Sequence, residues 1–294
     1  MFTGNDVIAL RQKTGAGVLD CKKALEETNG DMEKAVDYLR EKGIAKAAKK
    51  ASRIAAEGIV AAKIEGNTGV LVEVNCETDF VANGDKYRDF VAGVADYVLK
   101  NDVKDADELI EAKKNETIEA TATIGEKIAI RRFAKYTASD NGIVESYIHM
   151  GGKVGVLVEL EGCTCEKAHA AAHDIALQIA AAKPLYLNAS EVPQEVLEHE
   201  KEILKAQALN EGKPAAIIDR MVEGRVKKYY DEFCLINQLY IKDSSLTIEK
   251  YLANESKEMG KTLTIKRFTR FEMGEGLEKR NDDFAAEVEA QMKK

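Results

Sequence analysis

The chain has 294 residues, of which 45% are hydrophobic and 32% are charged, and its formal net charge is −8. This length is about twice the roughly 150 residues of a typical domain, so it predicts two or more modules of an ordinary soluble protein. No apolar stretch approaches the roughly 20 residues that a membrane span requires, and residues 1–6 lack the features of a secretory signal. We therefore expect neither a membrane-spanning nor a secreted protein.

Cysteine usage favours a reducing compartment, which we take to be the cytoplasm. The five cysteines are an odd number and are spread widely along the chain, so they argue against a disulfide framework. They are Cys21, Cys76, Cys163, Cys165 and Cys234.

Charge is distributed unevenly along the chain. Residues 1–55 carry a net charge of +3, whereas the remainder carries −11. Binding to a phosphate backbone requires a concentrated basic surface, and only the run of Lys and Arg between residues 42 and 53 offers one. A solvated helix face is the plainer interpretation of that run, so we expect no direct contact with nucleic acid.

The first 43 residues predict three short helices that form one small module. Asn5 or Asp6 caps the first helix, Asp31 caps the third, and Gly43 ends it. The second helix occupies residues 18–28. The turn at residues 14–17 resembles a phosphate loop only superficially, because no strand precedes it and no Gly-Lys-Ser/Thr follows.

An internal repeat dominates the rest of the chain. Residues 58–64 recur at 142–148, and residues 69–74 recur at 155–160. Each copy predicts a β-hairpin, because β-branched residues alternate on both sides of a glycine-containing turn at residues 66–67 or 151–152. A helix follows each hairpin, at residues 80–100 and 166–182.

A third strand closes each copy, and the spacing of the two strands indicates an insertion. Residues 128–133 match residues 263–268 at an offset of 135, about 50 more than the hairpin offset. The extra residues fall between about 187 and 240, where residues 191–210 and 215–231 predict two helices. Apolar residues seven apart, Val196 with Ile203 and Leu197 with Leu204, indicate an antiparallel helical hairpin with a coiled-coil seam. The overall prediction is an α+β fold with a duplicated core.

No motif for catalysis or cofactor binding is present in the sequence, so we expect neither an enzyme nor a bound cofactor. Cys165, His169 and His173 share one face of a predicted helix and could present metal ligands, but helix packing is the plainer interpretation. A calcium loop at Asp79 and Asp85 fails, because Val81 occupies a ligand position and no Glu closes the loop.

The junction at residues 75–81 is the most informative stretch. Thr78 or Asp79 caps the following helix, and Phe80 packs inward in the purely structural interpretation. The second copy lacks both the Asp and the Phe at residues 161–165, so the repeat does not need them to fold. This difference favours a functional role for Asp79 and Phe80.

The chain resembles the translation elongation factor Ts family over essentially its full length. The resemblance is carried by residues 11–25, 74–81, 179–184, 221–225 and 272–276. It implies a guanine-nucleotide exchange factor for the GTPase elongation factor Tu, which it binds in the GDP-bound and nucleotide-free states. It further implies a ubiquitin-associated-like module and linker at 1–55, core subdomains at 56–140 and 141–280, a dimerising hairpin at about 188–240 and a C-terminal helix at 281–294.

The resemblance also implies the partner-binding residues. Phe80, beside Asp79, looks like the family's wedge near the Mg²⁺ and phosphate site of the partner. The full set is Arg11, Val18 and Leu19 in the module, and Thr78, Asp79, Phe80, Val81, Ile124, Gly125 and His149 in the core. Two other classes stay open, a general interaction adaptor and an RNA-binding translation protein. The stoichiometry, one-to-one or two-plus-two, also stays open.

Overall fold

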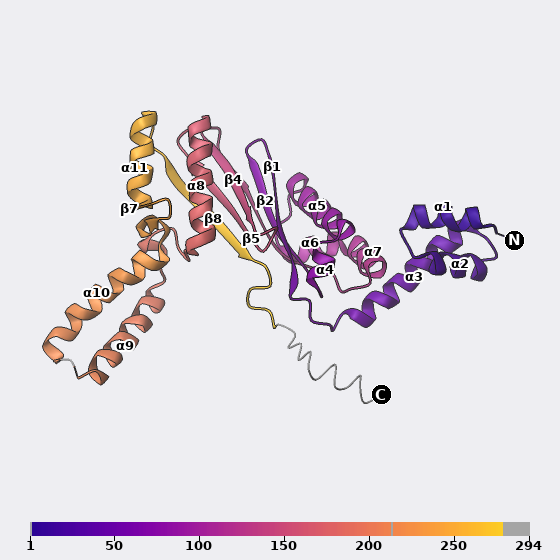
Figure 1. The fold of residues 1–294 in the computed structure, drawn as a ribbon, viewed down its shortest axis with the longest axis horizontal. Helices are drawn as coiled ribbons and strands as arrows, with labels where there is room; N and C mark the ends of the chain where they lie inside the picture. The colour runs from indigo at the N-terminus through magenta and orange to yellow at the C-terminus, as the bar shows by residue number, and fades with distance from the viewer. Residues whose placement is uncertain (1, 213, 279–294) are drawn as a thin grey trace.

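The computed structural model describes residues 2–212 and 214–278, and it confirms the α+β class (Figure 1). Two antiparallel three-stranded sheets form the centre of the described chain. The first contains β1 (Glu57–Glu65), β2 (Thr68–Cys76) and β3 (Ala129–Thr137), and the second contains β4 (Gly142–His149), β5 (Val154–Glu161) and β8 (Thr264–Glu272). The helix expected at 281–294 lies outside the described residues.

The N-terminal module has the three predicted helices, α1 (Gly4–Thr14), α2 (Val18–Glu27) and α3 (Met32–Lys50), around a small core that includes Leu10 and Leu25. The predicted cap of α1 at Asn5 or Asp6 is wrong. Thr3 is the cap, and it forms a reciprocal capping box with the Asp6 side chain. Asp31 caps α3 as predicted, through bonds to the N–H groups of Glu33 and Lys34.

The prediction that Gly43 ends the third helix is also wrong, because α3 continues through it to Lys50. Here α3 packs against α7 (Lys114–Ile124), and a Cβ added at Gly43 would lie 3.4 Å from the Cβ of Ala122. A glycine inside a helix costs about 1 kcal/mol relative to alanine. At this position it permits the close approach of two helices rather than marking an end.

Both predicted hairpins are present in matching register. Ile59 pairs with Val74 in the first hairpin, and Ile143 pairs with Leu160 in the second. Each copy also has an irregularity at the equivalent point, after Glu73 in one and after Glu159 in the other. The two copies therefore share fine details of backbone geometry as well as topology.

The two sheets pack face to face, and helices cover their outer faces (Figure 1). In β2 the side chains of Val70, Val72 and Val74 pack towards α5 (Asp85–Lys100), whereas Leu71 packs against the second sheet. The same alternation in β5 directs every second side chain towards α8 (Glu166–Ala182). A strand buried on both faces explains the nearly continuous apolar runs of β2 and β5.

Small residues, and in each copy a buried glutamate paired with arginine, complete the sandwich. A Cβ at Gly155 would lie 2.4 Å from the Cγ1 of Val60, so only glycine fits between the sheets there. Glu73 and Glu159 are both buried, and each accepts a hydrogen bond of 2.6 Å from an arginine Nε in its own copy, from Arg132 and Arg267 respectively. The duplicated sequence therefore supplies duplicated core chemistry.

The helix predicted at residues 80–100 is interrupted. The chain forms a short α4 (Asp79–Ala82) and then α5, with Gly84 at the N-cap of α5. Further elements were not predicted from the sequence: α6 (Ala106–Ala112), α7, the small β6 (Leu239–Tyr240) and β7 (Asp243–Thr247), and α11 (Ile248–Met259).

The insertion projects from the sheet layers as a helical hairpin of α9 (Gln194–Asn210) and α10 (Ala215–Phe233), flanked by short 3-10 helices at Ala189–Glu191 and Leu235–Asn237 (Figure 1). Leu197 and Leu204 pack in its interface against Ala208 and apolar residues of α10. Ile203 is 38% exposed, so only one of the two predicted heptad pairs, Leu197 with Leu204, lies between the helices.

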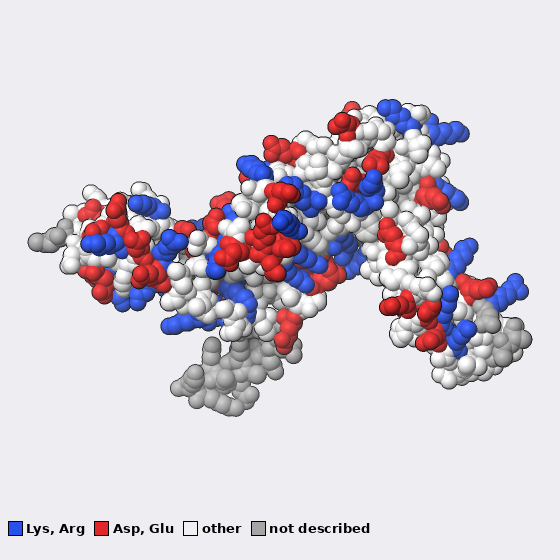
Figure 2. Space-filling view, turned by 180° about the vertical axis from the view of Figure 1, so that it is seen from behind, with Lys and Arg blue, Asp and Glu red and all other residues white. Residues whose placement is uncertain are grey.

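Charges of both signs are mixed on the surface of the described chain. Figure 2 shows acidic and basic side chains interspersed on one face of the molecule rather than gathered into a basic surface. Among the helices within residues 2–212 and 214–278, none is both long and apolar enough to cross a bilayer.

Candidate functional site

The β2–α4 junction presents Phe80 to solvent. Thr78 is the N-cap of α4, as predicted, and its Oγ1 accepts a hydrogen bond of 3.3 Å from the Val81 N–H. The inward-packing interpretation of Phe80 is wrong, because this side chain is 85% exposed. Val81 packs against the core of the first sheet instead, and Ala82 is buried. One turn of helix is thus anchored by two residues and carries Phe80 outwards.

A carboxylate from a distant loop holds this junction in place. Glu126 accepts hydrogen bonds from the backbone N–H groups of Glu77 and Thr78, at 3.1 and 3.0 Å, and from the Thr78 hydroxyl, at 2.7 Å. The Glu77 carboxylate in turn accepts from the Lys127 N–H at 2.7 Å and pairs with Arg53 at 3.2 Å. These crossed contacts bind the α7–β3 loop to the start of α4.

Ile124 and Gly125 consequently lie beside the junction. Ile124 is partly buried against the first-sheet core, and Gly125 ends α7 with a left-handed φ of 91°. The Lys50 ammonium donates a hydrogen bond to the Gly125 carbonyl, which ties the end of α3 to the same loop. Sequence reasoning missed Glu126, since a Glu in a Gly-Glu-Lys loop has no distinctive signature.

The β4–β5 turn, which carries His149, is brought to the same end of the molecule. Arg88 of α5 donates hydrogen bonds to the Asn83 side chain and to the Gly151 carbonyl, at 3.2 and 3.4 Å. Met150 beside it is 72% exposed and has a left-handed φ of 49°. We call residues 78–81, 124–125 and 149–150 the junction site. Two large apolar side chains protruding there are typical of a protein-binding surface.

The imidazole of His149 is held from one side. A hydrogen bond of 2.9 Å joins its Nδ1 to the Tyr147 hydroxyl, and the Tyr147 ring packs edge-on against His173 of α8. The Nδ1 atom is thereby occupied within the molecule. Nε2 is the ring nitrogen left for an external partner.

The three module residues predicted to bind the partner form a separate surface. Arg11 lies on α1, and Val18 and Leu19 begin α2, where they are 49% and 82% exposed. Within the described part of the chain, no hydrogen bond or ion pair joins them to the junction site. The structure therefore brings together Thr78, Asp79, Phe80, Val81, Ile124, Gly125 and the His149 turn, and it leaves Arg11, Val18 and Leu19 apart.

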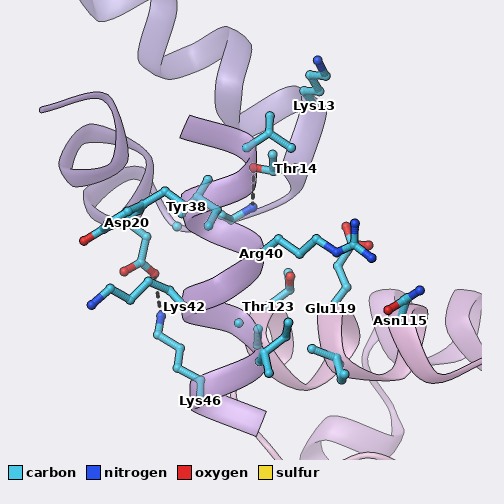
Figure 3. A pocket seen from close by; sticks show the side chains of 18 of the residues that line it. Lys13, Thr14, Asp20, Tyr38, Arg40, Lys42, Lys46, Asn115, Glu119 and Thr123 are labelled. Atoms are coloured by element: carbon cyan, nitrogen blue, oxygen red, sulfur yellow. Dashed lines mark hydrogen bonds and ion pairs between the residues drawn. The ribbon is translucent and has the colours of Figure 1, made fainter. Parts of the chain in front are cut away.

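A cavity of about 570 Å³ is lined by residues of the module and of α7 (Figure 3). Asp20 and Lys46 form an ion pair of 2.9 Å on one side of it, and Glu119 of α7 lies on another. None of the predicted partner-binding residues lines it. A second cavity of about 340 Å³, between the end of α1 and α7, has Ile124 in its wall. Phe80, Val18 and Leu19 are instead exposed on the surface of the molecule.

The predicted metal candidates have other neighbours. His169 lies 3.4 Å from Glu145, His173 packs on Tyr147, and the Cys165 thiol contacts the Met259 sulfur at 3.7 Å. Among the described His, Cys, Asp and Glu residues, no group of three or more is arranged to hold a metal ion. Burial, reinforced by the nearby Glu126 carboxylate, raises the pKa of the Cys76 thiol to about 12. A thiol with so high a pKa is a packing group rather than a nucleophile.

These features define the class of protein as a duplicated two-sheet α+β core with a three-helix module, a helical insertion and exposed apolar contact surfaces. The family model for Elongation factor TS matches residues 77–275. Elongation factor Ts of Clostridium novyi (strain NT) is 52% identical over 305 aligned residues that cover 99% of both chains. Elongation factor Ts of Trichlorobacter lovleyi is 50% identical over 98% of both chains, as is that of Clostridium perfringens (strain SM101 / Type A). The chain belongs to the elongation factor Ts family.

Proposed function

We propose that the chain is a guanine-nucleotide exchange factor that acts on elongation factor Tu during translation elongation. Family membership along nearly the whole chain supports the general activity. The observation that carries the mechanism is the 85% exposure of Phe80. The junction that carries it is held by the Thr78 cap, by Glu126 and by the bond from the Lys127 N–H to Glu77. The factor performs no covalent chemistry of its own and uses no cofactor.

In this proposal, burial of the Phe80 side chain against the partner supplies the free energy with which Phe80 acts as a wedge. Burying an exposed phenylalanine contributes about 1.5 to 3 kcal/mol, and that energy becomes available only when a partner covers the side chain. The Thr78 cap and the Glu126 clamp fix the junction before the encounter, so little of this energy is lost in ordering the backbone. Asp79, in the first turn of α4, places a carboxylate beside the wedge.

Exchange then follows from thermodynamic linkage. A factor that weakens GDP binding by some ratio must be weakened by GDP in the same ratio. Typical couplings between two sites are about 1 to 3 kcal/mol, or roughly 5- to 150-fold. In our proposal Phe80 enters between helices of the partner, the Mg²⁺ site loosens, and the phosphate-binding loop releases GDP. Loss of a bound cation removes the largest local charge that holds the phosphates.

The remaining parts take supporting roles in this proposal. Residues 1–55 dock on the GTPase domain of the partner through Arg11, Val18 and Leu19. The core subdomains at 56–140 and 141–280 carry the junction site, and the insertion at about 188–240 provides a surface for a homodimer. The factor works in the cytoplasm on GDP-bound and nucleotide-free partner, without direct contact with nucleic acid.

The test is the release of a fluorescent GDP analogue from elongation factor Tu by catalytic amounts of the protein. We expect Phe80→Ala to retain complex formation but to stimulate release at least about tenfold less, since each factor of ten corresponds to about 1.4 kcal/mol. Leu209→Ala is the matched control, because Leu209 is 59% exposed but lies on the helical hairpin.

The outcomes separate the competing classes. Unchanged stimulation by Phe80→Ala would refute the wedge. Complex formation without acceleration by the unaltered protein would identify an interaction adaptor. Affinity for RNA that falls steeply with salt would identify an RNA-binding protein instead.

A further inference from the structure

The duplication gives the molecule a second tip that is the counterpart of the junction site. The hairpin offset of 86 places Cys163 and Cys165 where the first copy has Glu77 and Asp79, and the offset of 135 places Met259 where it has Ile124. The structure agrees, since α7 ends at Gly125 and α11 ends at Gly260, both with left-handed φ values, 91° and 63°. We call Cys163, Cys165 and Met259 the sulfur tip.

The sulfur tip lies at the opposite end of the sheet layers from the junction site. The Val60 N–H donates to the Gly152 carbonyl, which places the β4–β5 turn beside the junction end of the first hairpin. The Ala138 N–H donates to the Asn67 carbonyl, which places the β1–β2 turn beside the end that carries Cys163. A ligand at the sulfur tip would therefore leave the junction site uncovered.

Two contacts bring Cys163, Cys165 and Met259 of two chain segments together at this tip. The Cys165 thiol contacts the Met259 thioether at 3.7 Å, and the Cys165 N–H donates to the Cys163 sulfur at 3.2 Å. Cys163 is only 6% exposed, Cys165 is exposed, and Met259 packs partly into the core of the second sheet. An ion pair of 3.8 Å between Lys167 and Glu258 also joins the start of α8 to the end of α11.

The separation of the Cys165 and Met259 sulfurs is compatible with both binding one soft metal ion. Metal–sulfur bonds of about 2.3 Å that diverge by 120° place two sulfur ligands about 4 Å apart, close to the observed Cys165–Met259 separation. A backbone N–H donated to a cysteine sulfur stabilises the thiolate that binds a metal, and so does the N-terminus of α8, which follows Cys165. Soft thiolate and thioether ligands suit Cu(I), zinc and iron–sulfur clusters. Structural zinc sites use four ligands of cysteine and histidine type, so a set of two cysteines and one methionine favours Cu(I).

We propose that Cys163, Cys165 and Met259 bind one thiophilic monovalent metal ion, represented by Cu(I). Cys163 is buried whereas Cys165 is exposed, so Cys165 is the accessible entry point of the site. The site is absent from the first copy, where the equivalent positions hold a glutamate, an aspartate and an isoleucine.

The test is an anaerobic titration of the full-length, reduced protein against the Cu(I)–bicinchoninate complex. The unaltered protein is expected to withdraw one equivalent of Cu(I). Cys165→Ser and Met259→Leu are each expected to lower the affinity at least tenfold. Met150→Leu is the matched control, because it removes a methionine sulfur that is 72% exposed at the other end of the molecule, and it should bind as the unaltered protein does.

X-ray absorption of the copper-loaded protein should show three sulfur neighbours. No withdrawal of copper, or equal affinity in Met259→Leu and Met150→Leu, would overturn the proposal. Coordination by two sulfurs would overturn the three-ligand arrangement. Met259→Leu preserves side-chain volume, so it decides the question even where Cys165→Ser fails to fold.

Discussion

Replacing Glu126 should release the junction that carries Phe80 without unfolding the protein. Glu126→Ala removes all three hydrogen bonds that the carboxylate accepts from Glu77 and Thr78. Glu126→Gln keeps the shape and one carbonyl oxygen but loses the charge. We therefore expect a graded series in which Gln is intermediate between Glu and Ala.

The size of the expected destabilisation follows from the hydrogen bonds that Glu126 accepts. Hydrogen bonds to charged groups contribute up to about 1.5 to 3 kcal/mol each when well shielded, but ordinary ones contribute about 0.5 to 1.5. Glu126 is half-buried and its donors lie at the surface, so the lower values apply. With three such bonds lost, the expected decrease in the free energy of unfolding is about 1.5 to 4.5 kcal/mol for Ala and about half of that for Gln. A typical domain stability of about 5 to 15 kcal/mol leaves both variants folded.

Urea unfolding measures the global loss, and amide hydrogen exchange locates it. The Glu77 and Thr78 amides should exchange at least about tenfold faster in Glu126→Ala, because about 1.4 kcal/mol corresponds to one factor of ten. GDP release from elongation factor Tu should be stimulated less by the variant. Glu111→Ala is the control: Glu111 and its partner Lys114 are 73% and 58% exposed, so this change should cost under about 0.5 kcal/mol.

The role of Glu126 in holding the junction is refuted if the free energy of unfolding of Glu126→Ala lies within about 0.5 kcal/mol of that of the unaltered protein and the Glu77 and Thr78 amides keep their protection from exchange. Weaker exchange stimulation with unchanged protection would place Glu126 in direct contact with the partner instead. The two measurements therefore separate a positioning role from a contact role.

Two further predictions concern the core. Gly155→Ala should destabilise the protein by about 1 to 3 kcal/mol in urea, because the new Cβ would lie 2.4 Å from the Cγ1 of Val60. Gly93→Ala on α5 meets nothing within 4 Å and should stabilise by up to about 1 kcal/mol; equal effects would refute the packing argument. Burial opposes ionisation of Asp174, but hydrogen bonding and charge from Lys242 outweigh it and lower its pKa. The ionised Asp174 therefore stabilises the folded protein fully above about pH 4, and this stabilisation is lost as pH falls through the folded pKa. In Asp174→Asn, the thermal unfolding midpoint should decrease less steeply with falling pH in the acid range than in the unaltered protein.

The repeat made much of the core predictable from the sequence. Two copies of one hairpin gave the strands, their turns and the position of the insertion, because the second copy tests each assignment in the first. Gly43 shows where local rules fail. Its role is set by Ala122 on a helix about 80 residues further along the chain, and no local pattern reports that contact.

The sequence could indicate that folding does not need Asp79 and Phe80, but it could not indicate which residues hold their segment in place. The absence of Asp79 and Phe80 from the second copy indicated that folding does not require them, and the exposure of Phe80 agrees. The residues that fix the junction come from elsewhere. Glu126 and Arg88 act across 48 and 63 residues of sequence, through a loop carboxylate and a backbone carbonyl. Such contacts depend on how α5 and α7 lie against the sheet, which periodicity does not determine.

The difference between the two copies is where function is to be sought. Both keep the features that the sandwich needs: alternating valines, a glycine between the sheets, and a buried glutamate paired with arginine. The side chains at the two tips are not part of this core packing, since neither Phe80 nor Cys165 is buried. A duplicated fold can therefore change its tips at little cost in stability. The junction site presents the exposed ring of Phe80 on a segment that Glu126 holds, whereas the sulfur tip presents Cys163, Cys165 and Met259. The two ends of the same scaffold therefore present chemically unlike surfaces.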